Sequence, residues 1–222
     1  MEKLRFYFDP RCPWCYQTSR WACRLEELGE VAIDWGLFCL EVVNRAEGVD
    51  PLAIDARSGP ALRTAFLLRD KVGRQAVGDL YHALGERLWE SEAPLEVDDL
   101  AGIRDSLTGM GVDPRLLDEA LADRGTWEGV VAEHEALVSR TGAFGVPTIV
   151  LDDGEGPAIF GPVVYELPDD EKTVELWQHT VWLVRYGNFA ELKRGRGGLP
   201  DLPAMEYRVR QYAERGGRRA AG

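Results

Sequence analysis

Two cysteines separated by two residues directly follow a short apolar segment near the start of the chain. Residues 4–8, LRFYF, are apolar and rich in aromatic side chains, which predicts a short buried strand. Cys12 and Cys15 come next, and apolar residues at helical spacing predict a helix that begins at Pro13. Residues 31–40, VAIDWGLFCL, are apolar enough for a second buried strand. Strand, helix and strand in this order predict a βαβ unit with two parallel strands.

The position of Cys12 at the first turn of this helix predicts a reactive thiol. Unpaired backbone N–H groups and the positive end of the helix dipole stabilise a thiolate there, which lowers the pKa of the cysteine. Cys15 follows one turn later, near enough to form a disulfide with Cys12 after small adjustments, and is expected to resolve mixed disulfides. Pro13 suits a first helical turn because it lacks an N–H, and Trp14 provides an aromatic wall beside the sulfur.

A Cys-x-x-Cys pair is also typical of half of a zinc site. Such a site needs a second pair of ligands, whereas Cys23 and Cys39 stand alone and the three histidines lack zinc-ligand spacing. Redox chemistry is therefore the preferred interpretation, and no bound metal is expected. The chain has no G-x-G-x-x-G or P-loop motif, so no tightly bound nucleotide or flavin is expected either.

After the second strand the pattern changes to helices. From about residue 61 to 140 only helical signals appear, with apolar residues recurring at intervals of three and four. Asp98 is expected to cap one of these helices and Asp113 another. The predicted organisation is one discontinuous domain, residues 1–50 and 141–222, with an α-helical domain, residues 51–140, inserted into it.

Strand character returns in the last third of the chain. Residues 147–151 are predicted to form a strand, which a turn connects to an antiparallel partner starting at Ala158, and a helix follows from about 169 to 185. Val146–Pro147 opens the first of these strands, where a proline is tolerated but restrictive because it cannot donate to the ladder. Together with the upstream cysteine pair, it predicts a cis bond that exposes the backbone of residue 146 to a substrate.

The composition excludes several classes of protein. The chain has 222 residues, of which 45% are hydrophobic and 29% charged, as in an ordinary globular protein. No apolar run approaches the roughly 18 residues of a membrane span, and the start lacks a signal peptide, which favours a cytoplasmic protein. The net charge of −12 argues against binding of nucleic acid. Residues 189–222 are more basic, and five arginines lie in this tail: Arg208, Arg210, Arg215, Arg218 and Arg219. Binding of an anion is one interpretation of them, and the preferred one is that they solvate the terminus or pair with the acidic body.

The isolated cysteines and histidines are interpreted as structural. His134 lies on an apolar helical stripe and is expected in the core, whereas His82 and His179 lie off their stripes and are expected in solvent. Cys23 and Cys39 are expected to be small buried hydrophobic residues. No imidazole is therefore expected to activate Cys12, which leaves the helix N-terminus, assisted by Arg11, for that task.

These motifs resemble the thioredoxin-fold proteins of the DsbA type, in which a helical domain is inserted between a βαβ half and a ββα half. The matching features are F-D-P-x-C-P-W-C, the long helical stretch and G-V-P-T, and they span essentially the whole chain. Within this superfamily the chain is similar to the mycothiol-dependent nitroreductase group, through FDPRCPWCYQTSRW, Asn44, IFGPVVYELP and NFAELKRGR.

The resemblance implies a cytoplasmic dithiol oxidoreductase. Cys12 would be the nucleophile and Cys15 the resolving thiol, acting on disulfides or nitroaromatic compounds, with mycothiol or a similar small thiol as co-substrate. The substrate-binding residues that it implies are Pro13, Trp14, Asn44, Val146 and Pro147. Implied partners are the small thiol and a small-molecule or protein disulfide, with no nucleic acid or membrane, and with a homodimer left open. Arg11, Tyr16 and Val146 depart from the group's usual residues, which leaves the choice of substrate open.

Two alternatives remain. One is an enzyme like the kappa-class glutathione transferases and isomerases of the same superfamily, which typically carry serine at the position of Cys12. The presence of both thiols argues against it. The other is a non-catalytic, chaperone-like protein that binds partners through the helical block. Substitution of Cys12 and Cys15 by serine distinguishes these possibilities from a dithiol enzyme.

Overall fold

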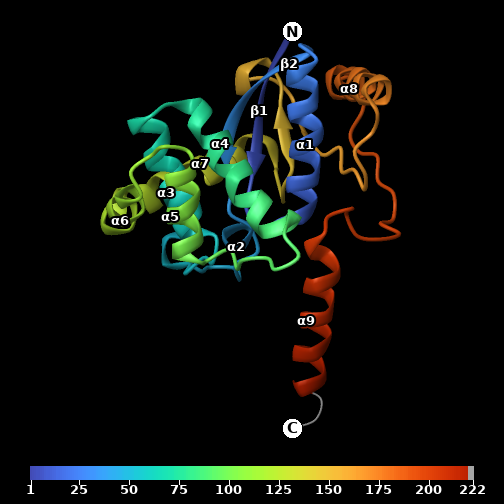
Figure 1. Ribbon diagram of the computed structural model, residues 1–222. Coiled ribbons are helices and arrows are strands. Elements are labelled where there is room, and N and C mark those ends of the chain that lie inside the picture. Colours follow the sequence, from blue (N-terminus) through green and yellow to red (C-terminus); the bar gives the residue numbers. More distant parts are fainter. Residues whose placement is uncertain (220–222) are drawn as a thin grey trace.

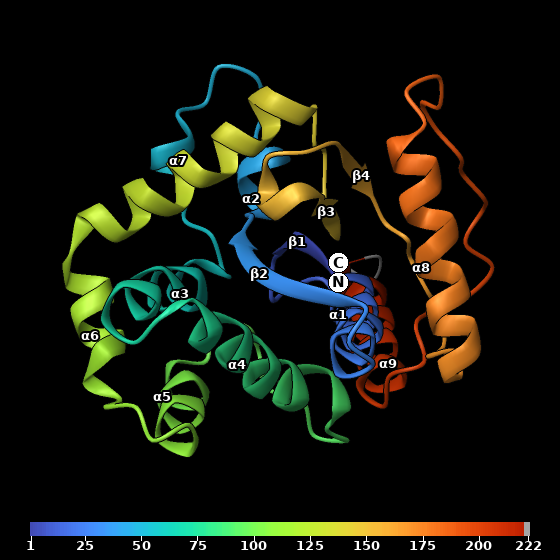
Figure 2. The same cartoon turned by 90° about the horizontal axis from the view of Figure 1, so that it is seen from above.

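A mixed four-stranded sheet lies at the centre of the molecule (Figures 1 and 2). The computed structural model describes residues 1–219, with side chains as far as Gln211. The strands are β1 (Glu2–Phe8), β2 (Val31–Leu37), β3 (Thr148–Val150) and β4 (Ala158–Phe160), in the order β2-β1-β3-β4. β1 is parallel to β2 and antiparallel to β3, which is antiparallel to β4. The predicted βαβ and ββα halves and the α/β fold class are confirmed.

Helices cover the sheet on both sides. In Figure 2, α7 lies on one face of the sheet and α1 with α8 on the other, while α3 to α6 gather beside the edge strand β2. The helices are α1 (Pro13–Glu27), α2 (Leu40–Val43), α3 (Gly59–Lys71), α4 (Arg74–Gly85), α5 (Leu100–Gly109), α6 (Arg115–Ala122), α7 (Arg124–Thr141), α8 (Asp170–Arg185) and α9 (Ala204–Arg219). A π-helical turn (Glu86–Glu90) continues α4, and 3-10 turns form at Pro51–Ala53 and Asp152–Gly154. No helix in the described part of the chain is both long and apolar enough to cross a bilayer.

The second strand is shorter than its apolar run predicts. It ends at Leu37, and the chain turns into the short helix α2 where residues 38–40 were expected to continue the strand. Side chains take the N–H groups that a longer strand would use: His134 Nδ1 accepts from Cys39 N at 3.3 Å and Asp9 Oδ2 from Leu40 N at 2.7 Å. These contacts come from distant parts of the chain, so the local apolar pattern does not report them.

The helix-capping residues differ slightly from those predicted. Asp99, rather than Asp98, caps α5, because its Oδ1 accepts from Ala101 N at 3.0 Å. Asp98 instead forms an ion pair with Arg57 at 3.0 Å. Asp113 behaves as expected, since its Oδ1 accepts the N–H of Arg115 at 2.9 Å at the start of α6.

The helices between β2 and β3 are joined closely to the sheet. Leu37 N donates to Glu133 Oε1 of α7 at 3.0 Å, and α4 packs against both α1 and β2. The approach of α4 requires glycine, because a Cβ on Gly85 would lie 1.9 Å from the Tyr16 ring. One continuous hydrophobic core spans the sheet and these helices. Domain boundaries near residues 50 and 140 stay a prediction.

The end of the chain forms an extended segment and a last helix, α9, which extends below the body in Figure 1. Arg208 anchors the start of this helix: it donates to Leu95 O at 2.6 Å and its guanidinium lies 4.6 Å from the centre of the Trp89 ring. Arg208 thus packs on the helical block, and Arg210 pairs with Glu206 at 3.0 Å in the same helix. The side chains of Arg215, Arg218 and Arg219 lie outside the described residues.

Candidate active site

Cys12 lies at the N-terminus of α1, just beyond the carboxyl end of β1. A turn connects the two elements, in which Cys12 N donates to Asp9 O at 3.0 Å. Cys12 is the N-cap residue, with extended backbone angles, and its Sγ accepts from Cys15 N at 3.4 Å. Pro13 occupies the first helical turn, where its missing N–H costs nothing. The predicted position of the first thiol is confirmed.

The two cysteines of the motif differ in exposure. Cys12 is half-buried, whereas Cys15 is fully buried and its thiol donates to Tyr7 O at 3.7 Å. Both are free thiols. An incoming substrate therefore reaches Cys12 first, and Cys15 is accessible only to a group already attached there. This asymmetry suits a nucleophile followed by a resolving thiol.

The loop before β3 brings Val146 and Pro147 to Cys12. The Val146–Pro147 bond is cis, as predicted, and a second cis bond precedes Pro162. The Cys12 thiol donates to Val146 O at 3.7 Å, although the two residues are 134 positions apart. Val146 and Pro147 are buried, so this carbonyl forms one wall of a narrow site around the sulfur.

Two aromatic side chains pack together beside the motif. The ring of Trp14 meets the Tyr165 ring edge-on, with 5.1 Å between their centroids. Tyr165 is fixed to α1 because its carbonyl accepts from Gln17 Nε2 at 2.9 Å. Trp14 therefore lies in the site as expected, and Tyr165, in the segment IFGPVVYELP, lies beside it.

Asn44 does not join this group in the structure. It is exposed at the end of α2, and its Nδ2 donates to Leu40 O at 2.7 Å within its own turn. Among the described residues, its side chain has no hydrogen bond to any other predicted site residue. Its substrate-binding role therefore stays a prediction from the resemblance.

The electrostatics of Cys12 differ from the expectation. Burial is the main influence and raises the pKa of Cys12 to about 11, and the charge of Asp9 acts in the same direction. The backbone N–H groups of Cys15 and Trp14 lower the pKa, as does the charge of Arg196, but their combined effect is smaller. The helix N-terminus alone therefore does not hold Cys12 as a thiolate in the free protein. Burial also raises the pKa of Cys15 well above its usual value.

Asp9 is a site residue that sequence reasoning missed. Its carboxyl group is fully buried beneath the motif, where it accepts from Arg11 N at 2.9 Å, Leu40 N at 2.7 Å and Ser58 Oγ at 3.2 Å. Burial raises its pKa to about 6, although the backbone N–H donors lower it. The available signal was a charged residue at the end of a buried strand, three positions before the first cysteine of the motif.

The remaining cysteines and histidines fall into two groups. His134 and Cys39 are fully buried, as expected, and burial lowers the pKa of His134 to about 4. Cys23 is half-buried and packs against the hydrophobic core, which is close to the expectation. The expectation that His82 lies in solvent was wrong: it is half-buried, and its Nε2 lies 3.3 Å from Cys23 Sγ. His179 is exposed, as expected. In residues 1–219, no group of three or more His, Cys, Asp or Glu side chains has a metal-binding arrangement.

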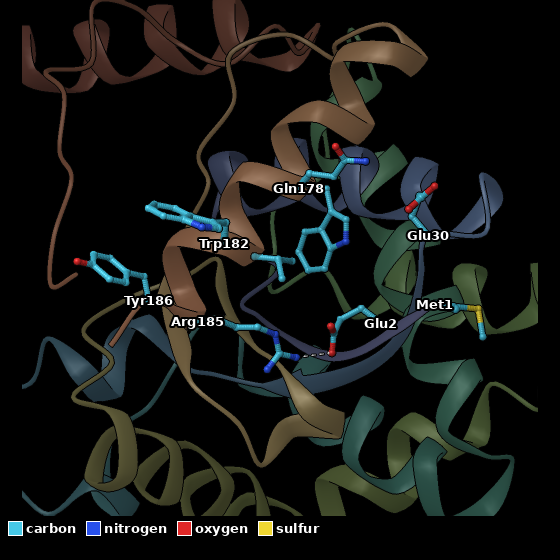
Figure 3. A pocket seen from close by; sticks show the side chains of 9 residues that line it. Met1, Glu2, Glu30, Gln178, Trp182, Arg185 and Tyr186 are labelled. Atoms are coloured by element: carbon cyan, nitrogen blue, oxygen red, sulfur yellow. Dashed lines mark hydrogen bonds and ion pairs between the residues drawn. The ribbon is translucent and has the colours of Figure 1, made fainter. Parts of the chain in front are cut away.

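A surface pocket lies away from the two cysteines. Figure 3 shows it between α8 and the start of β1, with Trp182 and Tyr186 on one side and Met1 on the other. Arg185 crosses it to form an ion pair with Glu2 at 2.9 Å. This pocket is at the amino end of β1, whereas Cys12 follows the carboxyl end, so the two are separated by the length of the strand.

Comparison with known proteins gives consistent matches. The family model described as mycothiol-dependent nitroreductase Rv2466c matches residues 11–194. An uncharacterised protein of Mycobacterium tuberculosis, Rv2286c, is 30% identical over 215 residues, which cover 96% of this chain and 90% of that protein.

Solved structures share the fold at lower identity. A probable DsbA oxidoreductase from Streptomyces coelicolor is 19% identical, with a TM-score of 0.58, over 89% of this chain and 95% of that one. A cytosolic disulfide reductase, DsbM from Pseudomonas aeruginosa with GSH, is 16% identical, with a TM-score of 0.54, over 82% of this chain and 100% of that one. These likenesses establish a DsbA-like thioredoxin fold. With the family model, they show that the chain belongs to the Rv2466c-like family of thioredoxin-fold oxidoreductases.

Proposed function

We propose that this protein is a dithiol reductase that uses Cys12 and Cys15 to reduce disulfides, with a small thiol of the mycothiol type as electron donor. The observation that carries the proposal is the placement of Cys12. Its sulfur lies at the N-terminus of α1, between the N–H of the buried Cys15 and the carbonyl of Val146. The family match to residues 11–194 supports mycothiol as the donor. The likeness to a cytosolic reductase supports a cytoplasmic location.

The reaction runs through two thiol–disulfide exchanges. Cys12 attacks one sulfur of the substrate disulfide, forms a mixed disulfide and displaces the first substrate thiol. Cys15 then attacks the Cys12 sulfur, which releases the second substrate thiol and leaves a disulfide between the two cysteines. The substrate gains two electrons and two protons, which the protein dithiol loses. Two small thiols then reduce the protein disulfide and become a disulfide themselves.

The raised pKa of Cys12 determines the step of the reaction at which the thiol loses its proton. Because burial favours the neutral thiol at about pH 7, the free protein holds Cys12 mainly as S–H. The proton must therefore leave as the substrate disulfide is attacked, and the departing substrate thiolate is the group that gains a proton overall. Such a thiol is protected from indiscriminate oxidation between turnovers.

Reduction of nitroaromatic compounds is the second candidate function, favoured by the family match. The conversion of a nitro to a nitroso group consumes two electrons and two protons and releases water, which matches oxidation of one dithiol to a disulfide. Trp14 is half-buried and Tyr165 is exposed, and their aromatic rings are available near Cys12 for contact with a nitroaromatic ring.

The two functions are tested by assaying disulfide and nitroaromatic reduction in parallel, with mycothiol, glutathione and a thioredoxin system as donors. We expect Cys12→Ser to lower kcat/KM by roughly three orders of magnitude or more, because it removes the nucleophile. We expect Cys15→Ser to accumulate a mixed disulfide on Cys12, detected by mass spectrometry. Cys23→Ser is the matched control, because Cys23 lies outside the motif and pairs with His82.

Other outcomes favour the alternatives. Turnover that survives in Cys12→Ser contradicts the dithiol mechanism. Activity that needs Cys12 but not Cys15, with no trapped intermediate, favours a transferase or isomerase. Binding of unfolded partners that neither substitution changes favours a chaperone-like protein.

A further inference from the structure

The segment between α8 and α9, residues 187–203, is here called the C-terminal strap. It passes the lower end of α1 in Figure 1, the end that carries Cys12. Tyr165 fixes it at two points: its Oη accepts from Gly197 N at 2.6 Å, and its carbonyl accepts from Asp201 N at 2.8 Å. Leu202 and Ala204 are buried just beyond these points. The strap is therefore attached to the same tyrosine that packs against Trp14.

Arg196 lies on the strap directly before Gly197. Its guanidinium is 5.0 Å from the centre of the Trp14 ring, and Trp14 is two residues from Cys12 in the same helical turn. A guanidinium over an indole face is held by a cation–π interaction. Tyr165 and Arg196 thus contact the same ring, which fixes a positive charge at the edge of the site.

The charge of Arg196 is available, whereas that of the other nearby arginine is not. Arg11, adjacent to Cys12, forms an ion pair with Glu41 at 2.6 Å. Among the side chains that the structure describes, those of residues 1–211, no carboxylate forms an ion pair with Arg196. The groups that face Cys12 fall into two sets. The charge of Asp9 and the carbonyl of Val146 disfavour a thiolate, whereas the N–H groups of Cys15 and Trp14 and the charge of Arg196 favour it.

We propose that Arg196 is a positioning residue whose charge stabilises the thiolate of Cys12 during attack. The inference rests on the proposed function, because it takes Cys12 to be the nucleophile. Burial and the negative charge of Asp9 act against ionisation, and the cation on the strap offsets part of that cost. Arg196 lies more than 170 residues after Cys12 in the sequence. The C-terminal strap brings its charge to the reactive sulfur.

The test is the rate at which iodoacetamide alkylates Cys12 as a function of pH. Iodoacetamide is uncharged, so the charge of Arg196 does not attract it. A change in the rate therefore reports a change in the fraction of Cys12 that is ionised. We expect Arg196→Gln to slow alkylation about three- to tenfold at each pH below the midpoint, since thiolate fraction follows the shift of the pKa. Arg196→Lys keeps the charge and is expected to restore the rate to within about twofold. Arg194→Gln, on the same strap, is the matched control and is expected to leave the rate unchanged.

Two further measurements separate charge from shape. Because Arg196 is exposed, the effect of Arg196→Gln should shrink markedly at about 1 M salt, where the Debye length is about 3 Å. Tyr165→Phe removes the acceptor for Gly197 N but keeps Arg196. It should therefore slow alkylation by a smaller factor than Arg196→Gln does. An Arg196→Gln rate within twofold of wild type at low salt overturns the proposal. If Arg196→Gln and Arg196→Lys slow alkylation equally, the proposal is also overturned, because the shape of the side chain and not its charge would then set the rate.

Alkylation requires no turnover, which keeps this inference distinguishable from the proposed function. Mass spectrometry assigns the modification to Cys12, with Cys12→Ser as the blank. If Arg196→Gln slows alkylation and the protein reduces no disulfide, the role of Arg196 stands and the proposed function fails. If disulfides are reduced and alkylation is insensitive to Arg196, the proposed function stands and this inference fails.

Discussion

Asp9 is a buried carboxyl group that links three separate parts of the chain. It accepts from the backbone of Arg11 in the active-site turn, from Leu40 at the start of α2, and from the hydroxyl of Ser58 before α3. A buried carboxylate is tolerated only where its oxygens are hydrogen-bonded. Asp9 therefore fixes the motif relative to the helical block, and it also makes stability depend on pH.

The effect of pH follows from the raised pKa of Asp9. The pKa is about 6 in the folded protein and 3.8 ordinarily, so between these values the folded protein binds this proton more tightly than the unfolded chain. The stability that the proton provides is fully present below about pH 4 and is lost as the pH rises through 6. The loss of stability amounts to roughly 3 kcal/mol.

Asp9→Asn removes this titration. We expect the variant to be less stable than wild type at pH 4 by about 1–3 kcal/mol, because one buried N–H loses its acceptor. By pH 7 the difference in stability should vanish or reverse, because wild type loses roughly 3 kcal/mol as Asp9 ionises and the variant loses nothing. Guanidinium titrations of both proteins at several pH values measure it. A difference that stays constant across this range would contradict the assignment of the pKa to Asp9.

Among single residues, the sequence indicates those that stand at a recognisable position in a local pattern. Cys12, Cys15 and Pro147 were identified because a strand, a helix start and a strand start each leave a local pattern. Asp9 and Arg196 were missed because their importance arises from contacts with residues far away in the chain. The lowered pKa expected for Cys12 was wrong, because the degree of burial of a sulfur is a property of the folded molecule.

The helix α4 shows how one element is fitted to its neighbours. Two of its glycines face aromatic rings, with an added Cβ only 2.2 Å from Trp35 at Gly78 and 1.9 Å from Tyr16 at Gly85. Glycine is unfavourable inside a helix, by about 1 kcal/mol relative to alanine. The cost is accepted here because it lets the helix pack directly on α1 and β2.

Gly85→Ala tests this packing. We expect it to lower the free energy of unfolding by roughly 1–3 kcal/mol, because the new methyl group must displace the buried Tyr16 ring. Gly109→Ala is the matched control at an exposed end of α5, where a Cβ meets nothing within 4 Å. It is expected to be neutral or to stabilise by up to about 1 kcal/mol. Chemical denaturation of both variants measures the contrast, and equal effects would show that the packing of α4 is loose.

Among the elements, the regular ones were predictable and the irregular ones were not. The amphipathic helices of the block and α8 appear where the apolar stripes place them. The end of β2 was misjudged, because side chains of Asp9 and His134 compete for its backbone. The C-terminal strap has no periodic pattern, and its course depends on hydrogen bonds to Tyr165, so no local signal predicts it.

The whole molecule is held by one core. Buried residues of the sheet, of α1 and of the helical block belong to a single hydrophobic cluster, and hydrogen bonds such as that from Trp89 Nε1 to Pro10 O, at 3.1 Å, cross between the parts. The inserted helices therefore do not have a separate core. A shared core makes unfolding of one part costly for the other.

We accordingly expect one cooperative unfolding transition for the reduced protein. Near-ultraviolet circular dichroism reports packing of the tryptophans, which lie both in the sheet region and in the block, while the far-ultraviolet signal reports mainly the helices. The two signals should change together on heating. An earlier loss of helical signal, with sheet-region packing retained, would indicate instead that the block unfolds as an independent unit.

The bond from the Cys12 thiol to the Val146 carbonyl has one more consequence. A sulfur in a disulfide carries no proton, so oxidation of the motif deprives this carbonyl of its donor. In the reduced protein the Cys12 thiol donates to the Val146 carbonyl. In the oxidised protein this carbonyl can instead accept from an amide N–H of a bound ligand. The Val146 carbonyl is therefore presented differently to ligands in the reduced and in the oxidised protein. The difference amounts to about one hydrogen bond, or roughly 1 kcal/mol in favour of peptide-like ligands on the oxidised form.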